Sequence, residues 1–135
     1  MAEAMVIDAS AWLALLLQEE KADLIAAHLT HHPLMAPELI RYEAANGILQ
    51  ARRRGRLLAQ EDSFKLLLRE ILDFPIEIVS PETWWLAGVR MVQKHPLTFY
   101  DAAYVGLAGV LGLPLLTLDD KILQALKLEK MESVL

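Results

Sequence analysis

Short apolar runs alternate with longer segments of helical periodicity along this chain. Five runs predict strands, at residues 5–7, 34–36, 76–79, 115–118 and 131–135. In the segments between them, apolar residues recur every three or four positions, which is typical of helices that pack one face against a core. Strands that alternate with helices indicate a parallel sheet covered by helices on both faces. The sequence therefore predicts an α/β fold with three layers, built on a central parallel sheet of four to five short strands.

The expected helices are bounded by residues that start or stop helical structure. Helices are expected at 11–18, 21–32, 38–54, from 60–62 onward, at 83–94, 99–111 and in a short segment that starts at 120. Pro33 and Pro75 end helices because proline has no backbone N–H to donate. Gly55 and Gly112 suit the position after a helix, where glycine is favoured. No repeat, low-complexity tract or linker interrupts the pattern, so residues 1–135 are expected to form one domain.

Four acidic residues lie where an apolar stretch gives way to a polar one. They are Asp8, Glu43, Asp101 and Asp119. Asp8 and Asp119 each follow a predicted strand and precede a predicted helix. Ligands of parallel α/β sheets bind at the carboxyl ends of the strands, near the N-termini of the helices that follow. The pattern therefore predicts that these acids converge on one pocket.

Three of these acids also have a purely structural explanation. Asp8 and Asp119 can cap the helices that follow them, and Asp120 is expected to cap the last helix as well. Thr98 and Asp101 have the spacing of a capping box, in which a hydroxyl and an acid satisfy the first turn of a helix. Each local explanation has to hold separately, whereas a single pocket accounts for all the acids together.

Glu43 is harder to explain by local structure, because it falls well inside a predicted helix. With Asn46 and Gln50 it forms a polar stripe on an otherwise apolar helix, since residues three or four apart share a face. The alternative is that this stripe is an ordinary exposed face. A stripe that begins with an acid also suits one wall of a pocket.

A cluster of four carboxylates calls for a cation. Two unit charges about 4 Å apart repel by roughly 4 kcal/mol at an effective dielectric constant near 20. Such a cluster raises the pKa of each carboxyl unless a cation neutralises it. Oxygen ligands without cysteine or histidine favour a hard ion, Mg²⁺ or Mn²⁺. A metal of this kind activates water and stabilises charge on a leaving oxygen, which is the chemistry of phosphodiester hydrolysis.

Charge and composition narrow the location and the partners of the chain. The net charge is −5, which argues against a broad electrostatic grip on nucleic acid. One basic run stands out as a candidate contact with RNA or with a partner protein: Arg52, Arg53, Arg54 and Arg56. There is no cysteine, no N-terminal secretory pattern and no unbroken apolar span, so a cytoplasmic protein without a membrane partner is expected.

Four motifs follow one another along the chain: V-I-D-A-S, E-A-A-N, T-F-Y-D-A-A-Y-V-G-L-A and L-L-T-L-D-D-K. By these motifs and their order, the chain resembles the PIN-domain ribonucleases, and specifically the VapC-type toxins of bacterial and archaeal toxin–antitoxin pairs. The resemblance covers essentially the whole chain. It implies that Asp8, Asp101 and Asp119 hold a metal directly or through water, and that Glu43 completes the pocket.

The same resemblance assigns three supporting residues. Ser10 and Thr117 match small hydroxyl positions that orient an acidic ligand or a water at the metal. Asn46 matches an amide found one turn after the helix acid. The resemblance also implies Mg²⁺- or Mn²⁺-dependent endonucleolytic cleavage of RNA that leaves a 5′-phosphate and a 3′-hydroxyl. It implies a small antitoxin partner, whose tail occludes the acidic pocket with a basic side chain in place of the cation.

Two further expectations concern assembly and the competing functions. Trp84 and Trp85 are adjacent on one predicted helix, so one of them is expected at the surface, where a large apolar side chain often marks an interface. This favours a homodimer, as does the resemblance. The alternative function is a PIN-like module that binds RNA or protein without cutting. A phosphoryl-accepting receiver domain is disfavoured because the strand 76–79 is followed by Ser80-Pro81 and not by an acceptor aspartate.

Overall fold

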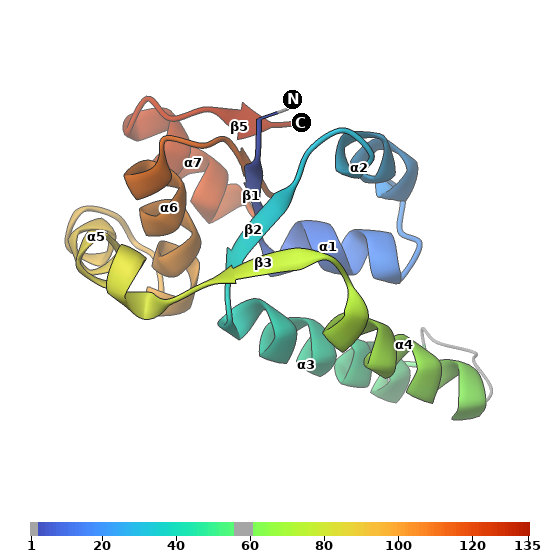
Figure 1. The fold of residues 1–135 in the computed structure, drawn as a ribbon. Coiled ribbons are helices and arrows are strands. Elements are labelled where there is room, and N and C mark those ends of the chain that lie inside the picture. Colours follow the sequence, from blue (N-terminus) through green and yellow to red (C-terminus); the bar gives the residue numbers. More distant parts are fainter. Residues whose placement is uncertain (1–2, 56–60) are drawn as a thin grey trace.

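The computed structural model of this protein describes residues 3–55 and 61–135. Its centre is a five-stranded parallel sheet with the strand order β3-β2-β1-β4-β5 (Figure 1). The strands are β1 (Met5–Ile7), β2 (Leu34–Pro37), β3 (Ile76–Val79), β4 (Leu115–Leu116) and β5 (Ser133–Val134). The order reverses direction at β1, which has β2 on one side and β4 on the other. The predicted parallel sheet is confirmed.

Seven helices are described: α1 (Ala9–Leu16), α2 (Ala22–Leu29), α3 (Leu39–Arg53), α4 (Glu61–Asp73), α5 (Pro81–Lys94), α6 (Phe99–Leu111) and α7 (Asp120–Leu128). Helices α5, α6 and α7 lie on one side of the sheet, and α1 and α2 lie on the other (Figure 1). Helix α1 contacts both α2 and α3, and α3 contacts α4. The three-layer α/β architecture predicted from the sequence is therefore confirmed.

Helix α6 has a long buried stretch, and it contacts strands β1, β2 and β4. Its residues 102–108 are all buried. It approaches α5 very closely, because a Cβ atom added to Gly106 would lie 2.7 Å from the backbone nitrogen of Gly88. Glycine at position 106 thus permits backbone-to-backbone packing of α5 and α6. This packing fixes the N-terminal end of α6, which carries Asp101.

Strand β4 is shorter than the sequence predicted, and side chains are the reason. The expected strand 115–118 stops at Leu116. The backbone N–H of Leu118 donates to Ser10 Oγ at 2.9 Å, and that of Asp119 donates to Thr117 Oγ1 at 3.0 Å. These N–H groups bond to hydroxyls instead of to a neighbouring strand. The chain therefore leaves the sheet at Leu116, earlier than predicted.

Strand β5 and helix α5 also differ from their predicted limits. The expected strand 131–135 is reduced to Ser133–Val134, because the N–H of Met131 donates to the carbonyl of Leu126 at 2.9 Å and closes the end of α7. Helix α5 begins at Pro81, two residues before the predicted start, since proline suits the first turn of a helix. No helix in the described ranges is long and apolar enough to cross a membrane.

Candidate active site

Asp8 lies at the end of β1 and caps helix α1. It is only 2% exposed. Its Oδ1 accepts hydrogen bonds from the N–H of Ala11 at 3.0 Å and from Ser10 Oγ at 2.7 Å. Its Oδ2 accepts a hydrogen bond from Thr117 Oγ1 at 2.5 Å. The capping explanation for Asp8 is therefore correct but incomplete, because the carboxylate also reaches across to the segment that follows β4.

Ser10 and Thr117 join the ends of two neighbouring strands, β1 and β4. Thr117 is 1% exposed, and its hydroxyl lies 3.4 Å from Ser10 Oγ. Ser10 Oγ accepts from the N–H of Leu118, and Thr117 Oγ1 accepts from the N–H of Asp119. Two hydroxyls thus tie the β1–α1 junction to the β4–α7 junction. They hold Asp8 and Asp119 at one edge of the sheet.

Asp119 is the N-terminal cap of helix α7. Its Oδ1 accepts a hydrogen bond from the N–H of Ile122 at 2.9 Å. The prediction that Asp120 caps this helix is wrong, because Asp120 is its first residue and is exposed. The physical reason is spacing: a capping oxygen reaches the N–H two or three residues further on, and position 119 meets this requirement.

Glu43 and Asp101 approach this edge from helices α3 and α6. Glu43 is half-buried, and its Oε1 accepts a hydrogen bond from Tyr104 Oη at 2.5 Å. Asp101 is also half-buried in the first turn of α6, where its N–H donates to the capping hydroxyl Thr98 Oγ1 at 3.1 Å. Tyr104 was not among the residues singled out from the sequence. Its place one turn after Asp101 in D-A-A-Y is the signal that could have indicated it.

The acids influence one another electrostatically. The pKa of Asp8 is raised from 3.8 to about 6, mainly by burial and in part by the charge of Asp119, while the hydrogen bonds from Thr117, Ala11 and Ser10 lower it. Burial also raises the pKa of Glu43, with additional increases from the charges of Asp101 and Asp8. Each of the four predicted acids therefore interacts electrostatically with at least one of the others.

The pKa of Asp101 is raised as well, first by burial and then by the charge of Asp119. Lys121, in the first turn of α7, acts in the opposite direction and lowers it. Burial and the nearby acids raise the pKa of Tyr104 well above its ordinary value, so this hydroxyl keeps its proton and acts as a donor. The edge as a whole carries excess negative charge, which a bound cation would relieve.

The comparison with known families settles what kind of domain carries this edge. A family model described as the PIN domain matches residues 5–127, which is nearly the whole chain.

The chain belongs to the PIN-domain family.

Curated relatives of this PIN domain are VapC-type ribonucleases. Ribonuclease VapC3 of Pyrobaculum aerophilum is 35% identical over 121 residues, which cover 87% of this chain and 91% of that protein. Ribonuclease VapC9 of Mycobacterium tuberculosis is 33% identical over 119 residues, 85% of each chain. The resemblance to VapC-type proteins that the motifs indicated is thereby confirmed.

Solved structures agree on the fold. The crystal structure of PAE2754 from Pyrobaculum aerophilum covers 93% of this PIN domain and aligns over 87% of its own chain, with 30% identity and a TM-score of 0.68. VapC20 of Mycobacterium tuberculosis, a toxin that cleaves the sarcin–ricin loop, has a TM-score of 0.64 at 16% identity, with 90% of this chain and 95% of that chain covered. A toxin–antitoxin complex from Klebsiella pneumoniae has a TM-score of 0.60 at 16% identity, with 87% and 88% covered.

The edge of the sheet that carries Asp8, Glu43, Asp101 and Asp119 is called the acidic edge below. Its donor set fits a hard divalent cation. It consists of carboxylate and hydroxyl oxygens, the ligand type that Mg²⁺ and Mn²⁺ prefer. Within residues 3–55 and 61–135, no three histidine, aspartate or glutamate side chains form a ready-made ligand cluster. Mg²⁺ does not require such a cluster, because it dehydrates reluctantly and is usually held by one or two carboxylates together with several waters.

Some predicted site residues lie away from the hydrogen-bonded acids. Asn46 is exposed on α3 and takes no part in the hydrogen bonds described above for this edge. The guanidinium of Arg52 stacks over the ring of Phe64, with its Cζ 4.1 Å from the ring centroid. Arg53 and Arg54 are exposed at the C-terminal end of α3. Arg56 lies outside the described residues.

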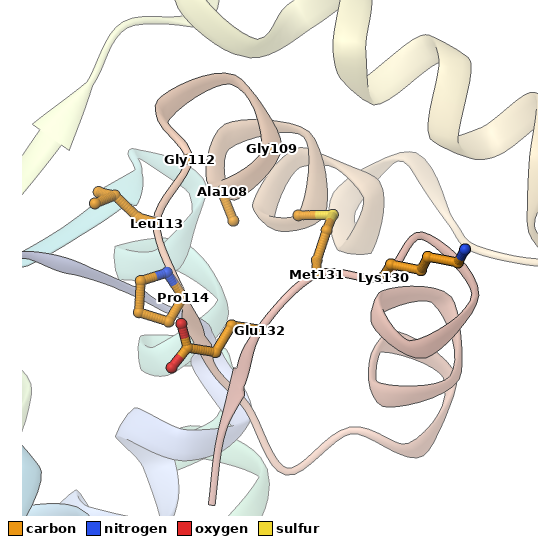
Figure 2. A pocket seen from close by; sticks show the side chains of 8 residues that line it. All are labelled: Ala108, Gly109, Gly112, Leu113, Pro114, Lys130, Met131 and Glu132. Atoms are coloured by element: carbon orange, nitrogen blue, oxygen red, sulfur yellow. The ribbon is translucent and has the colours of Figure 1, made fainter.

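The hollow at the other end of the PIN domain contains none of the four acids. It has a volume of about 260 Å³ and lies between the C-terminal end of α6 and the segments that lead into β4 and β5 (Figure 2). Its lining residues are Ala108, Gly109, Gly112, Leu113, Pro114, Lys130, Met131 and Glu132. This hollow is mostly lined by small and apolar residues, so it offers no set of convergent acids for metal chemistry.

Proposed function

We propose that this PIN domain is a metal-dependent endoribonuclease and the toxin component of a toxin–antitoxin pair. It hydrolyses RNA phosphodiester bonds at the edge formed by Asp8, Glu43, Asp101 and Asp119. The observation that carries the proposal is the pair of hydroxyl links that hold Asp8 and Asp119 at one edge of the sheet. Burial and neighbouring acids raise the pKa of Asp8, Glu43 and Asp101 at the same edge. The names of the curated VapC ribonucleases support the same activity.

In this proposal, Asp8, Asp101 and Asp119 hold Mg²⁺ or Mn²⁺ directly or through water, and Glu43 completes the acidic wall. When bound, the cation supplies an activated water and neutralises charge that develops on the leaving oxygen. Ser10 and Thr117 keep the Asp8 carboxylate in one orientation through the hydrogen bonds described above. Asn46 lies one turn beyond Glu43 on the exposed side of α3, where it is available to the RNA.

The RNA and the antitoxin are proposed to share one approach to the site. Arg53 and Arg54 provide exposed positive charge at the end of the helix that carries Glu43, and RNA backbone binding depends on such cations. An antitoxin that blocks the acids needs a basic side chain near the place of the cation. The toxin–antitoxin complex among the structural neighbours supports a protein partner of this kind.

A homodimer is proposed for the assembled toxin. Trp85 is 50% exposed whereas its neighbour Trp84 is 5% exposed, as their adjacency on one helix predicted. Leu86, on the same helix, is 73% exposed. Helix α5 therefore presents large apolar side chains to solvent, which is typical of surfaces that associate with another protein.

A second candidate function is a PIN module that binds RNA or protein without cutting it. The observation in its favour is the lack of a ready-made cluster of three metal ligands in the described ranges. Such a module binds divalent metal poorly and leaves RNA intact. A single cleavage experiment distinguishes this binding module from a ribonuclease.

That experiment incubates a mixed pool of RNA with the purified protein and Mg²⁺ or Mn²⁺. EDTA and the Asp101→Asn variant are run beside it, and Asp120→Asn is the matched control because Asp120 is an exposed neighbour of the site. We expect metal-dependent cuts that disappear with EDTA and in Asp101→Asn but persist in Asp120→Asn. Cuts that survive both EDTA and Asp101→Asn would rule out the four-carboxylate mechanism. Intact RNA under all conditions would favour the binding module.

A further inference from the structure

A buried tyrosine reaches into the acidic edge from the middle of helix α6. Tyr104 is 1% exposed, and its hydroxyl donates to Glu43 Oε1 at 2.5 Å. The two residues are 61 positions apart in the sequence, so the hydrogen bond joins α6 to α3. A buried hydroxyl needs a hydrogen-bond partner, because leaving it unpaired is costly, and here the partner is the Glu43 carboxylate.

The two partners differ in how firmly they are held. The ring of Tyr104 belongs to the hydrophobic core, and every residue from 102 to 108 around it is buried. Glu43 is only half-buried and has a long side chain with several rotatable bonds. Ordering a side chain of this type costs conformational entropy. The fixed tyrosine is therefore the group that determines where the Glu43 carboxylate points.

The chemical nature of the donor matters as much as its position. A lysine or arginine at this place would also orient Glu43, but it would cancel the negative charge. A phenol hydroxyl is neutral, so Glu43 keeps its full charge for a cation. The hydrogen bond from the phenol hydroxyl uses one lone pair of Glu43 Oε1 and leaves the rest of the carboxylate available.

We infer that Tyr104 is a positioning residue for the metal site: its hydroxyl fixes the Glu43 carboxylate while leaving its charge available to a divalent cation. This inference rests on the proposed function, because it assumes that the acidic edge binds metal. Outer-shell hydrogen bonds of this type commonly contribute 10- to 100-fold to metal affinity or activity. Tyr104 itself does not need to touch metal or RNA.

The test measures Mn²⁺ binding directly, by the electron paramagnetic resonance signal of free Mn²⁺ in titrations of the full chain. Tyr104→Phe removes the hydroxyl and keeps the ring, and we expect its Mn²⁺ affinity to fall by about 10-fold. The matched control is Tyr42→Phe, because the hydroxyl of Tyr42 also donates to a glutamate, Glu38, at an exposed position on α3. We expect wild-type affinity in this control. Thermal unfolding without metal verifies that each variant is folded at the titration temperature.

A double-mutant cycle distinguishes positioning from general damage to the core. In a Glu43→Ala background the hydroxyl has no carboxylate to hold, so adding Tyr104→Phe is expected to leave Mn²⁺ affinity unchanged. A full additional loss in the double variant would show that the hydroxyl acts through another route and would overturn the inference. Equal affinity of wild type and Tyr104→Phe would overturn it as well. If the wild type binds no Mn²⁺, the metal-dependent function itself fails, which is a separate result.

Discussion

The two ends of the parallel sheet differ in what they bring together. The carboxyl ends of the strands gather Asp8 and Asp119 with two buried or half-buried hydroxyls, and Glu43 and Asp101 join them from helices. The amino ends of β4 and β5 border a hollow of about 260 Å³ lined mostly by small and apolar residues. The first end has charge and ordered hydrogen bonds, whereas the second has empty space. In this fold, chemistry is indicated by convergent charge and not by the depth of a cavity.

The difference also has an energetic side. At the carboxyl ends, burial disfavours the ionised form of three acids, so the folded protein without metal carries an electrostatic cost there. At the amino ends, small residues leave a gap without any buried charge. Substitutions at the two ends are therefore expected to have opposite consequences for activity and stability.

The largest effect is expected from Asp119→Asn. Asparagine caps a helix about as well as aspartate, so this change removes the charge and keeps the hydrogen bond to Ile122. We expect RNA cleavage to fall by about 10²–10³-fold, the usual loss when one charge-stabilising group is removed. Single-turnover cleavage rates measure it.

Asp119→Ala is the control for the capping role. It removes the cap as well as the charge, and loss of a cap costs about 1 kcal/mol of stability. Chemical denaturation should therefore separate the two variants, although both are inactive. Full cleavage by Asp119→Asn would show that the charge of this residue is not needed.

The next effect concerns the stability of the metal-free protein as a function of pH. The pKa of Asp8 is raised from 3.8 to about 6, so the folded state binds this proton more tightly than the unfolded chain does. The associated stability is fully present below about pH 4 and is lost as the pH rises through about 6. We expect Asp8→Asn, which carries no titrating group, to be up to about 3 kcal/mol more stable than wild type at pH 7.

Urea denaturation in EDTA at a series of pH values measures this difference between wild type and Asp8→Asn. The Asp8→Asn variant should be inactive although it is more stable, because a functional charge is disfavoured by the fold. Parallel stability curves for the two proteins from pH 4 to pH 7 would contradict the buried, titrating Asp8. Glu43 and Asp101 are present in both proteins, and the loss of the Asp8 charge removes one of the causes that raise the pKa of Glu43.

A smaller effect is expected from the exposed cations at the end of α3. Arg53→Ala and Arg54→Ala should each weaken RNA binding and lower the salt dependence, by about 0.7 in the slope of log affinity against log salt for each lost phosphate contact. The measurement is the RNA affinity of each arginine variant as a function of salt, in a non-cleaving Asp101→Asn background. An unchanged slope in both variants would place the RNA elsewhere on the protein.

The smallest effect on activity is expected at the opposite end of the sheet. Gly109→Ala adds a methyl group that meets Met131 at 3.6 Å, an ordinary contact, and alanine is favoured over glycine in a helix by up to about 1 kcal/mol. We expect higher thermal stability and unchanged cleavage. The matched change Gly106→Ala should reduce stability, because its methyl group would lie 2.7 Å from the backbone of Gly88. Loss of cleavage in a folded Gly109→Ala variant would contradict the functional separation of the two ends.

The sequence predicted the sheet, and the placement of Asp8 and Asp119 after two of its strands, because these depend on local patterns. Asp8 and Asp119 each follow an apolar run, and parallel topology brings such strand ends to one edge. The same local reasoning offered both Asp119 and Asp120 as caps of the last helix, and only Asp119 caps it. The hydrogen bond from Tyr104 to Glu43 could not be predicted, because it depends on how α6 packs against α3 and no periodic pattern encodes that distance. The early end of β4 likewise depends on hydroxyl contacts with Ser10, which is far away in sequence.

The link between Ser10 and the segment from Thr117 to Asp119 has a consequence during synthesis of the protein. The N-terminal part of a domain leaves the ribosome first. Ser10 can contact Thr117 only after more than a hundred further residues have been made. A nascent chain that has emerged only as far as Leu111 already carries Asp8, Glu43 and Asp101, but it lacks Thr117, one of the two hydroxyls that hold Asp8, and the fourth acid. The acidic edge is completed only when residues 117–119 have left the ribosome, so translation products that stop before them lack the assembled site.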